Sequence, residues 1–340
     1  MTAERVSAVV VGYLDPAATV QAILSLQRQT WAPDEILVVD NHPARSISGA
    51  VEDMERVRVV SAGSNLGYTR GVNAGAAHAV GDWLVFLNPD AVAEPDALRL
   101  LLEAGAGADV AIVGAQVLLP DGRVNAGENP INLAGVSWSG GYGRPRERGP
   151  ARDAAGVSGA ALLVRRRAFE QLGGLCPDFF LYQDDADLCW RARLAGWRVR
   201  YCPEAAVAHD FEFDRGGQKW FYLERNREWM VLANLGPLAL VLLAPVLLAT
   251  EVAVTARAVA EGWLGAKVRS WGSLLANARN VARRRRWVQS GRRVPDREVL
   301  GRFRGGVETD LIESALLAWA NPLLERYRRF VLAVLGWARA

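Results

Sequence analysis

The feature that most constrains the fold is an alternation of short apolar runs and helical segments along the first 120 residues. The runs Ser7–Tyr13 and Glu35–Asn41 are rich in Val and Ile, which is typical of strands buried on both faces. Pro16–Gln29, between them, has apolar residues at helical spacing and proline in its first turn. This alternation predicts an α/β fold in which a mostly parallel sheet is flanked by helices. The other expected elements are the strands Val57–Ala62 and Asp82–Leu87 and the helices Thr69–Val80 and Pro95–Ala104.

The alternation stops at residues 120–155, which are rich in Gly, Pro, Asn and Arg. This composition predicts an insertion or a mobile loop. Regular structure is expected again from residue 159 onward, and it completes a first domain over residues 1–217. The expected elements of this part are the strands Gly159–Arg166 and Arg198–Cys202, the helix Leu188–Ala195 and a short extended piece at Ala206–Asp210.

Charge is distributed unevenly along the 340 residues, although the net charge is only +3. Residues 1–217 contain 20 Lys and Arg against 27 Asp and Glu, whereas residues 218–340 contain 20 against 10 and seven of the 12 tryptophans. An acidic first part and a basic, Trp-rich tail suggest chemistry in the first and attachment to an anionic surface in the second. Three cysteines without a Cys-x-x-Cys pair exclude a disulfide scaffold and a zinc site of that type, and suit a reducing compartment.

The tail contains a long apolar stretch, Trp229–Thr250, with 22 residues and no charge. That length could span a bilayer, but Pro237 and Pro245 are expected to interrupt it. A span would also put the Arg-rich tail on the opposite side of the membrane from the first domain, against the positive-inside tendency. We therefore predict that 218–340 is an α-helical region lying in the membrane plane, with Arg283–Arg286, Arg292 and Arg293 facing anionic headgroups.

Two alternatives for the tail remain. It could be a soluble helical subdomain that packs on the first domain, or an interface between two copies of the chain in a homo-oligomer. A nucleic-acid role for the basic run is disfavoured because Leu and Trp surround it.

Polar residues follow two predicted strands directly, where ligands bind in open α/β sheets. Asp40 and Asn41 end one strand, and Asn88-Pro89-Asp90 follows another. Tight turns alone would also explain such residues. Farther along, Asp184 and Asp185 are adjacent carboxylates that repel, so one pKa is raised if the pair is partly buried. Capping of the helix that follows is the alternative role for this pair.

The order of these motifs resembles that of the inverting family 2 glycosyltransferases of the GT-A fold. The likeness is greatest to bacterial rhamnosyltransferases and weaker to galactofuranosyltransferases, and it covers roughly residues 5–230. The motifs that carry it are Asp40-Asn41, the turn Asn65-Leu66-Gly67 with Gly71 and Asn73, Asn88-Pro89-Asp90, Tyr182–Cys189 and His209.

The resemblance implies a metal site. Asn88-Pro89-Asp90 stands where the family has Asp-x-Asp, which holds a divalent cation on the donor diphosphate. Because Asn comes first in this chain, Asp90 is the one carboxylate left, and Asn88 would meet the donor or the metal only indirectly. His209 matches the histidine that can complete the site, with Mg²⁺ or Mn²⁺ as the cofactor. A packed or surface histidine is the alternative.

The resemblance also implies the catalytic and donor-binding residues. Asp185 matches the general base that takes the proton of the acceptor hydroxyl, and Asp184 stands where Glu is more usual. Asp187 is expected to cap its helix or to pair with Arg191. The residues expected to bind the donor are Asp40, at the nucleobase, with Asn41, Asn65, Gly67, Arg70, Asn88 and Asp90.

The activity that the resemblance implies is transfer of a sugar from a nucleotide donor to a lipid-linked or polysaccharide acceptor in cell-envelope glycan synthesis. Rhamnose from dTDP-rhamnose is the expected donor sugar, residues 120–155 are expected to meet the acceptor, and the site is expected at the cytoplasmic face of the membrane. The alternatives are a galactofuranosyl- or other hexosyltransferase, a sugar nucleotidyltransferase and a non-catalytic membrane scaffold. The nucleotidyltransferase lacks support because Val11–Asp15 contains no Gly-rich loop with a following Arg.

Overall fold

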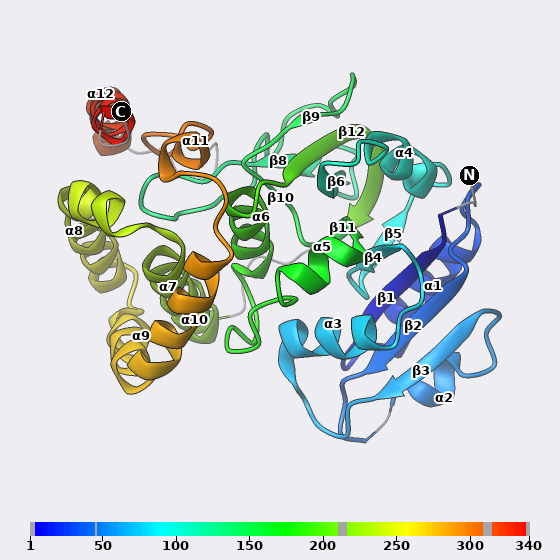
Figure 1. Cartoon of the computed structure of the whole chain (residues 1–340). Helices are drawn as coiled ribbons and strands as arrows, with labels where there is room; N and C mark the ends of the chain where they lie inside the picture. The colour runs from blue at the N-terminus through cyan, green and yellow to red at the C-terminus, as the bar shows by residue number, and fades with distance from the viewer. Residues whose placement is uncertain (1–3, 45, 210–215, 309–314, 338–340) are drawn as a thin grey trace. The chain divides into compact units, whose positions relative to one another are not determined.

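The computed structural model describes residues 4–44, 46–209, 216–308 and 315–337. The chain divides into two compact units, which are described separately below (Figure 1). The domain boundary expected at residue 217 stays a prediction. The first unit consists of Met1–Asn129, Ser139–Ala192 and Trp197–Phe211, and the second of Pro130–Trp138, Arg193–Gly196 and Glu212–Ala340.

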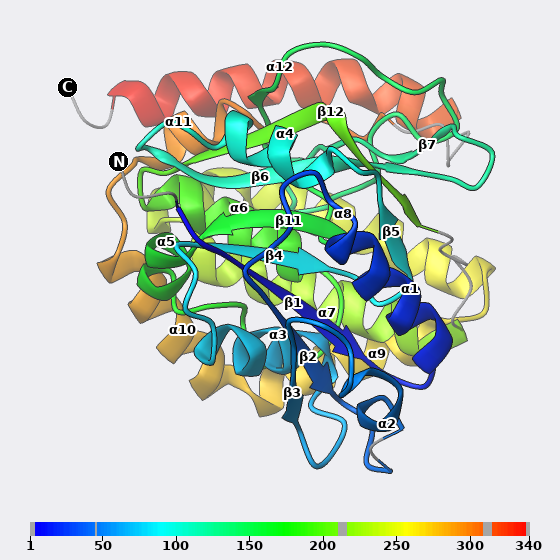
Figure 2. The same ribbon diagram turned by 90° about the vertical axis from the view of Figure 1, so that its right-hand side faces the viewer.

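The first unit is built on one large sheet with the strand order β3-β2-β1-β4-β11-β6-β12-β5 (Figure 2). Strand β11 is antiparallel to both of its neighbours and β5 is antiparallel to β12, while the other pairs on this path are parallel. The predicted mostly parallel sheet is therefore confirmed. The strands are β1 (Val6–Gly12), β2 (Glu35–Asp40), β3 (Val57–Ser61), β4 (Trp83–Leu87), β5 (Ala91–Ala93), β6 (Val110–Leu118), β11 (Ala161–Arg165) and β12 (Arg198–His209).

Helices cover both faces of this sheet. Asp15 caps α1 (Pro16–Gln27) by accepting a hydrogen bond from the amide of Ala18, and α1 packs on the face formed by alternate residues of β1 and β2. Helix α3 (Gly67–Ala77) lies on the other face, where a Cβ on its Gly75 would come within 2.5 Å of Val9. Small residues thus let α3 approach the sheet closely. The remaining helices of this unit are α2 (Ser48–Val51), α4 (Ala97–Ala104), α5 (Arg166–Gln171) and α6 (Asp184–Leu194).

Two parts of residues 120–155 are tied to the large sheet, because β7 (Val124–Ala126) pairs with β6 and β9 (Arg152–Asp153) pairs with β12. The short strand β8 (Glu128–Asn129) pairs with β10 (Gly156–Val157) in a separate two-stranded sheet. Arg146 makes a two-pronged ion pair with Glu94, with distances of 2.6 and 2.7 Å. These contacts anchor parts of a segment whose composition predicted an insertion or a mobile loop.

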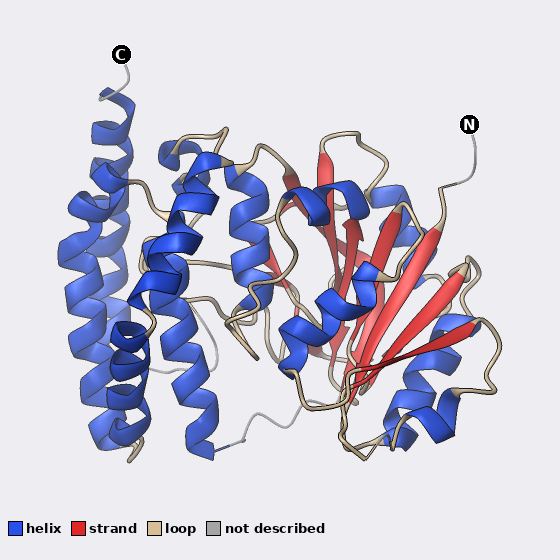
Figure 3. Cartoon of the chain, turned by 60° about the horizontal axis from the view of Figure 1, so that its bottom comes forward, coloured by secondary structure: helices blue, strands red, loops and turns tan. Residues whose placement is uncertain are grey.

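The second unit contains long helices, which Figure 3 shows in blue. The prediction that two prolines interrupt the apolar stretch is confirmed at Pro237 and wrong at Pro245. One helix ends at Asn234 and α8 begins at Pro237, whereas Pro245 lies inside α8 without ending it. Proline costs little at Pro237, where the helix begins and an amide would have no helical partner. The helices are α7 (Gly216–Asn234), α8 (Pro237–Ala260), α9 (Leu264–Ala276), α10 (Ala278–Ser290), α11 (Asp296–Leu300) and α12 (Ala315–Trp337).

By length and composition α8 could cross a membrane. Only 17% of its most apolar 18 residues are buried, whereas the core helix of a soluble protein is mostly buried.

Candidate active site

Two predicted metal ligands meet at the carboxyl end of β4. Nε2 of His209 lies 2.9 Å from Oδ1 of Asp90 and 3.5 Å from Nδ2 of the Asn88 side chain. The register of β5 explains this approach, because Ala91, next to Asp90, pairs with His209 at the end of β12. The His209 side chain is 7% exposed and that of Asp90 is 34% exposed. One carboxylate oxygen and one imidazole nitrogen thus face a partly open edge.

This donor set suits a divalent cation. A carboxylate and a neutral imidazole are common ligands of Mn²⁺, and phosphate oxygens of a nucleotide can fill the other positions. The prediction that Asp90 and His209 bind one ion agrees with their geometry and stays a prediction.

The adjacent acids Asp184 and Asp185 form the first turn of α6, which begins four residues earlier than expected. Oδ2 of Asp185 accepts a hydrogen bond of 2.9 Å from the amide of Gly159, and Oδ1 accepts one of 2.7 Å from the amide of Ala186. The residues just before the helix adopt left-handed backbone conformations, which are costly without glycine and cluster at functional sites. These residues are Phe180, Tyr182 and Gln183, with φ of 66°, 68° and 62°.

The environment of the two acids separates their roles. Burial, followed by the neighbouring charge of Asp185, raises the pKa of Asp184. Burial also raises the pKa of Asp185, but the amides of Gly159 and Ala186 oppose this shift because they bind the carboxylate form. We therefore expect Asp185 to ionise before Asp184, which leaves Asp185 as the carboxylate of the pair.

Asp187, the third acid of this turn, has a structural role. It pairs with Arg191 at 2.7 Å, and both side chains are almost completely buried. Arg191 also donates to the carbonyl of Leu172. The predicted pairing of Asp187 with Arg191 is confirmed.

The predicted donor-binding residues Asn41, Asn65 and Gly67 lie together beyond β2. Asn41 accepts from the amide of Leu66 at 2.8 Å, and Asn65 accepts from the amide of Gly67 at 2.9 Å. Gly67 has a φ of 76°, and a Cβ there would lie 2.7 Å from the carbonyl oxygen of Phe180. Only glycine fits this turn, so the backbone geometry alone explains the glycine at this position without a bound ligand.

Arg70 lies elsewhere on α3. Its Nε donates to the carbonyl of Pro177 at 2.8 Å, and the residue is exposed. The guanidinium therefore contributes to holding the segment before α6, and contact with a diphosphate stays a prediction.

Asp40 is fully buried and holds the loop after β2. Its Oδ2 accepts hydrogen bonds from the amide and the hydroxyl of Ser48 at 2.8 and 2.5 Å, and Oδ1 accepts from the amide of His42 at 3.2 Å. In the structure Asp40 thus organises the start of α2, and its predicted contact with a nucleobase stays a prediction.

Three aromatic residues near these sites escaped the sequence analysis. The Tyr68 hydroxyl donates to the carbonyl of Gly159 at 3.3 Å. Burial and, after it, the charges of Asp184, Asp185 and Asp90 raise the Tyr68 pKa well above its usual value. At the ends of β1 and β2, the rings of Tyr13 and His42 lie 5.6 Å apart. The available signal was the position of each ring at the end of a predicted strand: Tyr13 is the last residue of Ser7–Tyr13, and His42 directly follows Glu35–Asn41.

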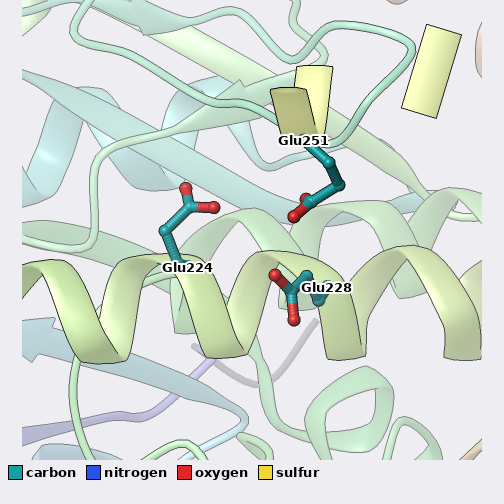
Figure 4. A group of neighbouring side chains, drawn as sticks. All are labelled: Glu224, Glu228 and Glu251. Atoms are coloured by element: carbon teal, nitrogen blue, oxygen red, sulfur yellow. The ribbon is translucent and has the colours of Figure 1, made fainter. Parts of the chain in front are cut away.

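The second unit contains another group of acids, which the sequence analysis did not predict. Figure 4 shows the side chains of Glu224 and Glu228 on α7 and of Glu251 on α8 close to one another. One carboxylate oxygen of each lies within 4.8 Å of the others. The Lys267 ammonium on α9 contacts all three, at 2.6, 2.8 and 2.7 Å. Arg227 pairs with Glu224 at 2.8 Å. Because Lys267 already supplies the positive charge, this cluster joins three helices and does not suit a metal.

The sequence profile described as Glycosyl transferase family 2 matches residues 7–173. The N-acetylglucosaminyl-diphospho-decaprenol L-rhamnosyltransferase of Mycobacterium tuberculosis is 32% identical over 218 residues, which cover 55% of this chain and 70% of that protein. The chain belongs to the family 2 glycosyltransferases. It is accordingly a glycosyltransferase, and membership of this family replaces the alternative of a sugar nucleotidyltransferase.

Solved structures agree on the fold of this glycosyltransferase. GalNAc-T7 with UDP, GalNAc and Mn²⁺ matches with a TM-score of 0.57 at 13% identity, over 68% of this chain and 48% of that one. The mannosyltransferase PcManGT of Pyrobaculum calidifontis, in complex with GDP-Man and Mn²⁺, matches with a TM-score of 0.51 at 17% identity, over 85% and 86% of the two chains. The chain therefore spans about half the length of GalNAc-T7, and the predicted GT-A fold is confirmed.

Proposed function

We propose that this glycosyltransferase transfers L-rhamnose from dTDP-L-rhamnose to a sugar carried on a lipid diphosphate, in cell-envelope glycan synthesis. The name of the mycobacterial relative supports both the sugar and the acceptor class. The observation that carries the proposal is the Asp185 carboxylate, which two backbone amides orient at the start of α6.

The proposed reaction inverts the anomeric carbon. The acceptor hydroxyl oxygen forms the new bond to this carbon while the bond to the nucleotide diphosphate breaks, and Asp185 takes the hydroxyl proton. Asp184 keeps its own proton near neutral pH, because burial and the Asp185 charge raise its pKa. The neutral Asp184 then adds no further repulsion to the diphosphate leaving group.

Asp90 and His209 would hold the divalent cation, which when bound neutralises charge on the diphosphate. Mn²⁺ fits better than Mg²⁺, since Mg²⁺ prefers oxygen ligands and His209 offers nitrogen. Both matched structures contain Mn²⁺ with a nucleotide or nucleotide sugar, which supports a divalent cation as the cofactor of this chain. We place the nucleobase against Tyr13 and His42, whose rings follow β1 and β2.

The donor can be identified by thermal shift on the whole chain. We expect dTDP-L-rhamnose with Mn²⁺ to raise Tm, and each of them alone to raise it less, because the cation and the diphosphate share a site. A donor at 100 times its Kd stabilises the folded state by about 2.7 kcal/mol.

The controls are UDP-galactofuranose, GDP-mannose and dTDP-glucose, each with Mn²⁺. Rhamnosyl transfer is then measured with an N-acetylglucosaminyl-diphospho-lipid acceptor. Stabilisation and transfer with UDP-galactofuranose alone would replace rhamnose by galactofuranose. Absence of transfer from every donor and acceptor would contradict the proposed reaction.

We also propose that the second unit binds the cytoplasmic surface of the membrane as a peripheral anchor. The outward face of α8 is apolar from Leu238 to Val252, and Val241 on it is 71% exposed. Helix α12 packs against α8, with the Tyr327 hydroxyl donating to the carbonyl of Leu242 at 2.6 Å. The exposed residues of α12 include Trp319, Leu323, Arg326, Arg329, Phe330 and Trp337, the mixture that an interfacial helix presents to anionic lipid.

Two of the arginines predicted to face headgroups serve another purpose. Arg285 donates to the carbonyl of Leu235 at 2.7 Å, at the end of α7. Arg292 donates to the carbonyl of Asn234 and pairs with Asp296 at 2.7 Å. Both therefore cap α7, where cations are favoured at a helix C-terminus.

We expect the protein to sediment with vesicles that contain anionic lipid and to do so less with neutral vesicles. Each Lys or Arg near an anionic surface contributes about 1 kcal/mol. The double variant Arg326→Gln/Arg329→Gln should weaken this binding several-fold, and salt should release only part of the protein, since the apolar face of α8 remains. Cosedimentation at increasing salt measures both effects.

Arg99→Gln, on the surface of the first unit, is the matched control and should sediment like the parent. Extraction by neither salt nor alkaline carbonate would indicate that α8 spans the bilayer. A dimer that ignores vesicles of every composition would contradict the membrane proposal and indicate an interface between copies.

A further inference from the structure

Both backbone polar groups of Gly159, its amide and its carbonyl, make hydrogen bonds to side chains of the candidate site. Its amide donates to Oδ2 of Asp185 at 2.9 Å, and its carbonyl oxygen accepts from the Tyr68 hydroxyl at 3.3 Å. The residue that follows, Ala160, accepts at its carbonyl from the amide of Asn88 at 2.9 Å. Residues from three separate elements therefore meet at this short stretch of backbone.

The absence of a side chain at Gly159 keeps Asp185 close. A Cβ at this position would lie 3.2 Å from Cβ of Asp185 and 3.5 Å from its Oδ2. The first of these distances is shorter than ordinary van der Waals contact, so a side chain at this position would require Asp185 to shift by a few tenths of an ångström.

Tyr68 is itself fixed at its backbone. Its amide donates to the carbonyl of Phe180 at 2.7 Å, and the amide of Thr69 donates to the same oxygen at 3.3 Å. Phe180 belongs to the left-handed stretch that leads into α6. Tyr68 thus joins the first turn of α3 to two backbone segments, Gly159, which contacts Asp185, and Phe180, which leads into α6.

We infer that Tyr68 is a positioning residue for sugar transfer, and that it acts through the Gly159 backbone to hold the Asp185 carboxylate in place. The inference rests on the proposed function, in which Asp185 is the base. The Tyr68 hydroxyl fixes the Gly159 carbonyl, and the Gly159 amide then keeps its alignment with Oδ2 of Asp185. An aligned amide stabilises the ionised carboxylate, so the contact sets both the place and the basicity of the base.

The kinetic constants of Tyr68→Phe distinguish a positioning role from a role in substrate binding. Tyr68→Phe removes one hydroxyl from the chain and, because Tyr68 is uncharged near neutral pH, changes no charge. We expect kcat to fall about 3- to 10-fold, the range that one neutral hydrogen bond supplies. The donor KM should stay unchanged, whereas a tyrosine that bound the sugar would raise KM.

The pH profile supplies a second readout. A looser Gly159 amide stabilises the Asp185 carboxylate less, so its pKa rises and the acid limb of the kcat profile moves to higher pH in Tyr68→Phe. The other acids near Asp185 and Tyr68 are Asp184 and Asp187 on α6 and Asp90 after β4, and both proteins contain them all. A shift between the two profiles therefore reports the hydroxyl.

Two further variants test the relay itself. Gly159→Ala should also lower kcat and leave donor binding intact, because the added methyl group would lie 3.2 Å from Cβ of Asp185 and require this side chain to shift. In an Asp185→Asn background, Tyr68→Phe should have no further effect on the residual transfer, since the group that it positions is absent. Tyr201→Phe, which removes a buried hydroxyl from β12, is the matched control and should leave kcat, KM and the acid limb as in the parent.

The outcomes separate this inference from the proposed function. Near-parent transfer by Asp185→Asn would remove Asp185 as the base and with it the proposed mechanism. An inactive Asp185→Asn, together with a Tyr68→Phe that keeps both kcat and the acid limb, would overturn the positioning role alone. A raised donor KM with unchanged kcat in Tyr68→Phe would also overturn it.

Discussion

Asp185→Asn is expected to lower kcat for sugar transfer by roughly 10²-fold or more, the usual contribution of a positioned general base. Asparagine has nearly the same shape and can still accept from the amide of Gly159 through its side-chain oxygen. It cannot take a proton from the acceptor hydroxyl. Donor binding should therefore remain, and titration calorimetry with the nucleotide sugar measures it separately from turnover.

The pH dependence of the parent enzyme gives the same test without a mutation. The base acts only when ionised, so kcat should fall as pH falls through the Asp185 pKa. Burial raises this pKa above the ordinary value, and the fall should therefore begin at a higher pH than for an exposed aspartate. Because Asp184 and Asp185 interact, the limb belongs to the pair.

Asp184→Asn is the comparison that assigns the role. It removes the acid with the buried, protonated carboxyl and should cost less than Asp185→Asn, because this group is not the proton acceptor. The acid limb should stay close to that of the parent, because Asp184 is still protonated when Asp185 ionises and therefore carries no charge to remove. If Asp184→Asn were the inactive variant and Asp185→Asn the active one, the two roles would have to be exchanged.

Local patterns were sufficient to predict β1, β2 and α1, because their signals lie within a single window of sequence. Strand β6 was missed although it is buried along its whole length. Its valines are interrupted by Ala, Gly and Gln, so it lacks the continuous run of valines that predicted β1. The predicted break at Pro245 failed because residue preferences are local. Pro245 and Val241, whose carbonyl loses its helical partner, both lie on the exposed face of α8.

The site illustrates the same limit. Asp90 and His209 lie 119 residues apart, and the pairing of β5, a strand of only three residues, brings them together. No spacing rule could reveal this contact, and only the family resemblance implied it. Arg285 shows the reverse case, since its place in a run of arginines suggested a surface role while its contact with α7 is structural. Charge in sequence does not specify which partner a side chain finds in the fold.

Asp90→Ala and His209→Ala are each expected to weaken donor binding in Mn²⁺ on the order of 10²-fold, at least the cost of losing a group that supports a metal ligand. The double variant should bind no more weakly than the weaker single one, because loss of either ligand already removes most of the shared ion. In chelator the three variants and the parent should bind the donor alike. Titration calorimetry with and without Mn²⁺ gives all eight affinities.

Asn88→Asp tests the site in the opposite direction. It restores the first carboxylate of the family motif beside His209, whose Nε2 lies 3.5 Å from Nδ2 of the Asn88 side chain. A second carboxylate next to the cation should tighten Mn²⁺ binding, and more so in His209→Ala, where one ligand is missing. If His209 and Asp90 formed only a structural hydrogen bond, each alanine variant would weaken donor binding equally with and without Mn²⁺, and Asn88→Asp would rescue neither. Full transfer by the parent enzyme in chelator would remove the metal from the reaction and leave Asp90 and His209 as direct contacts of the donor.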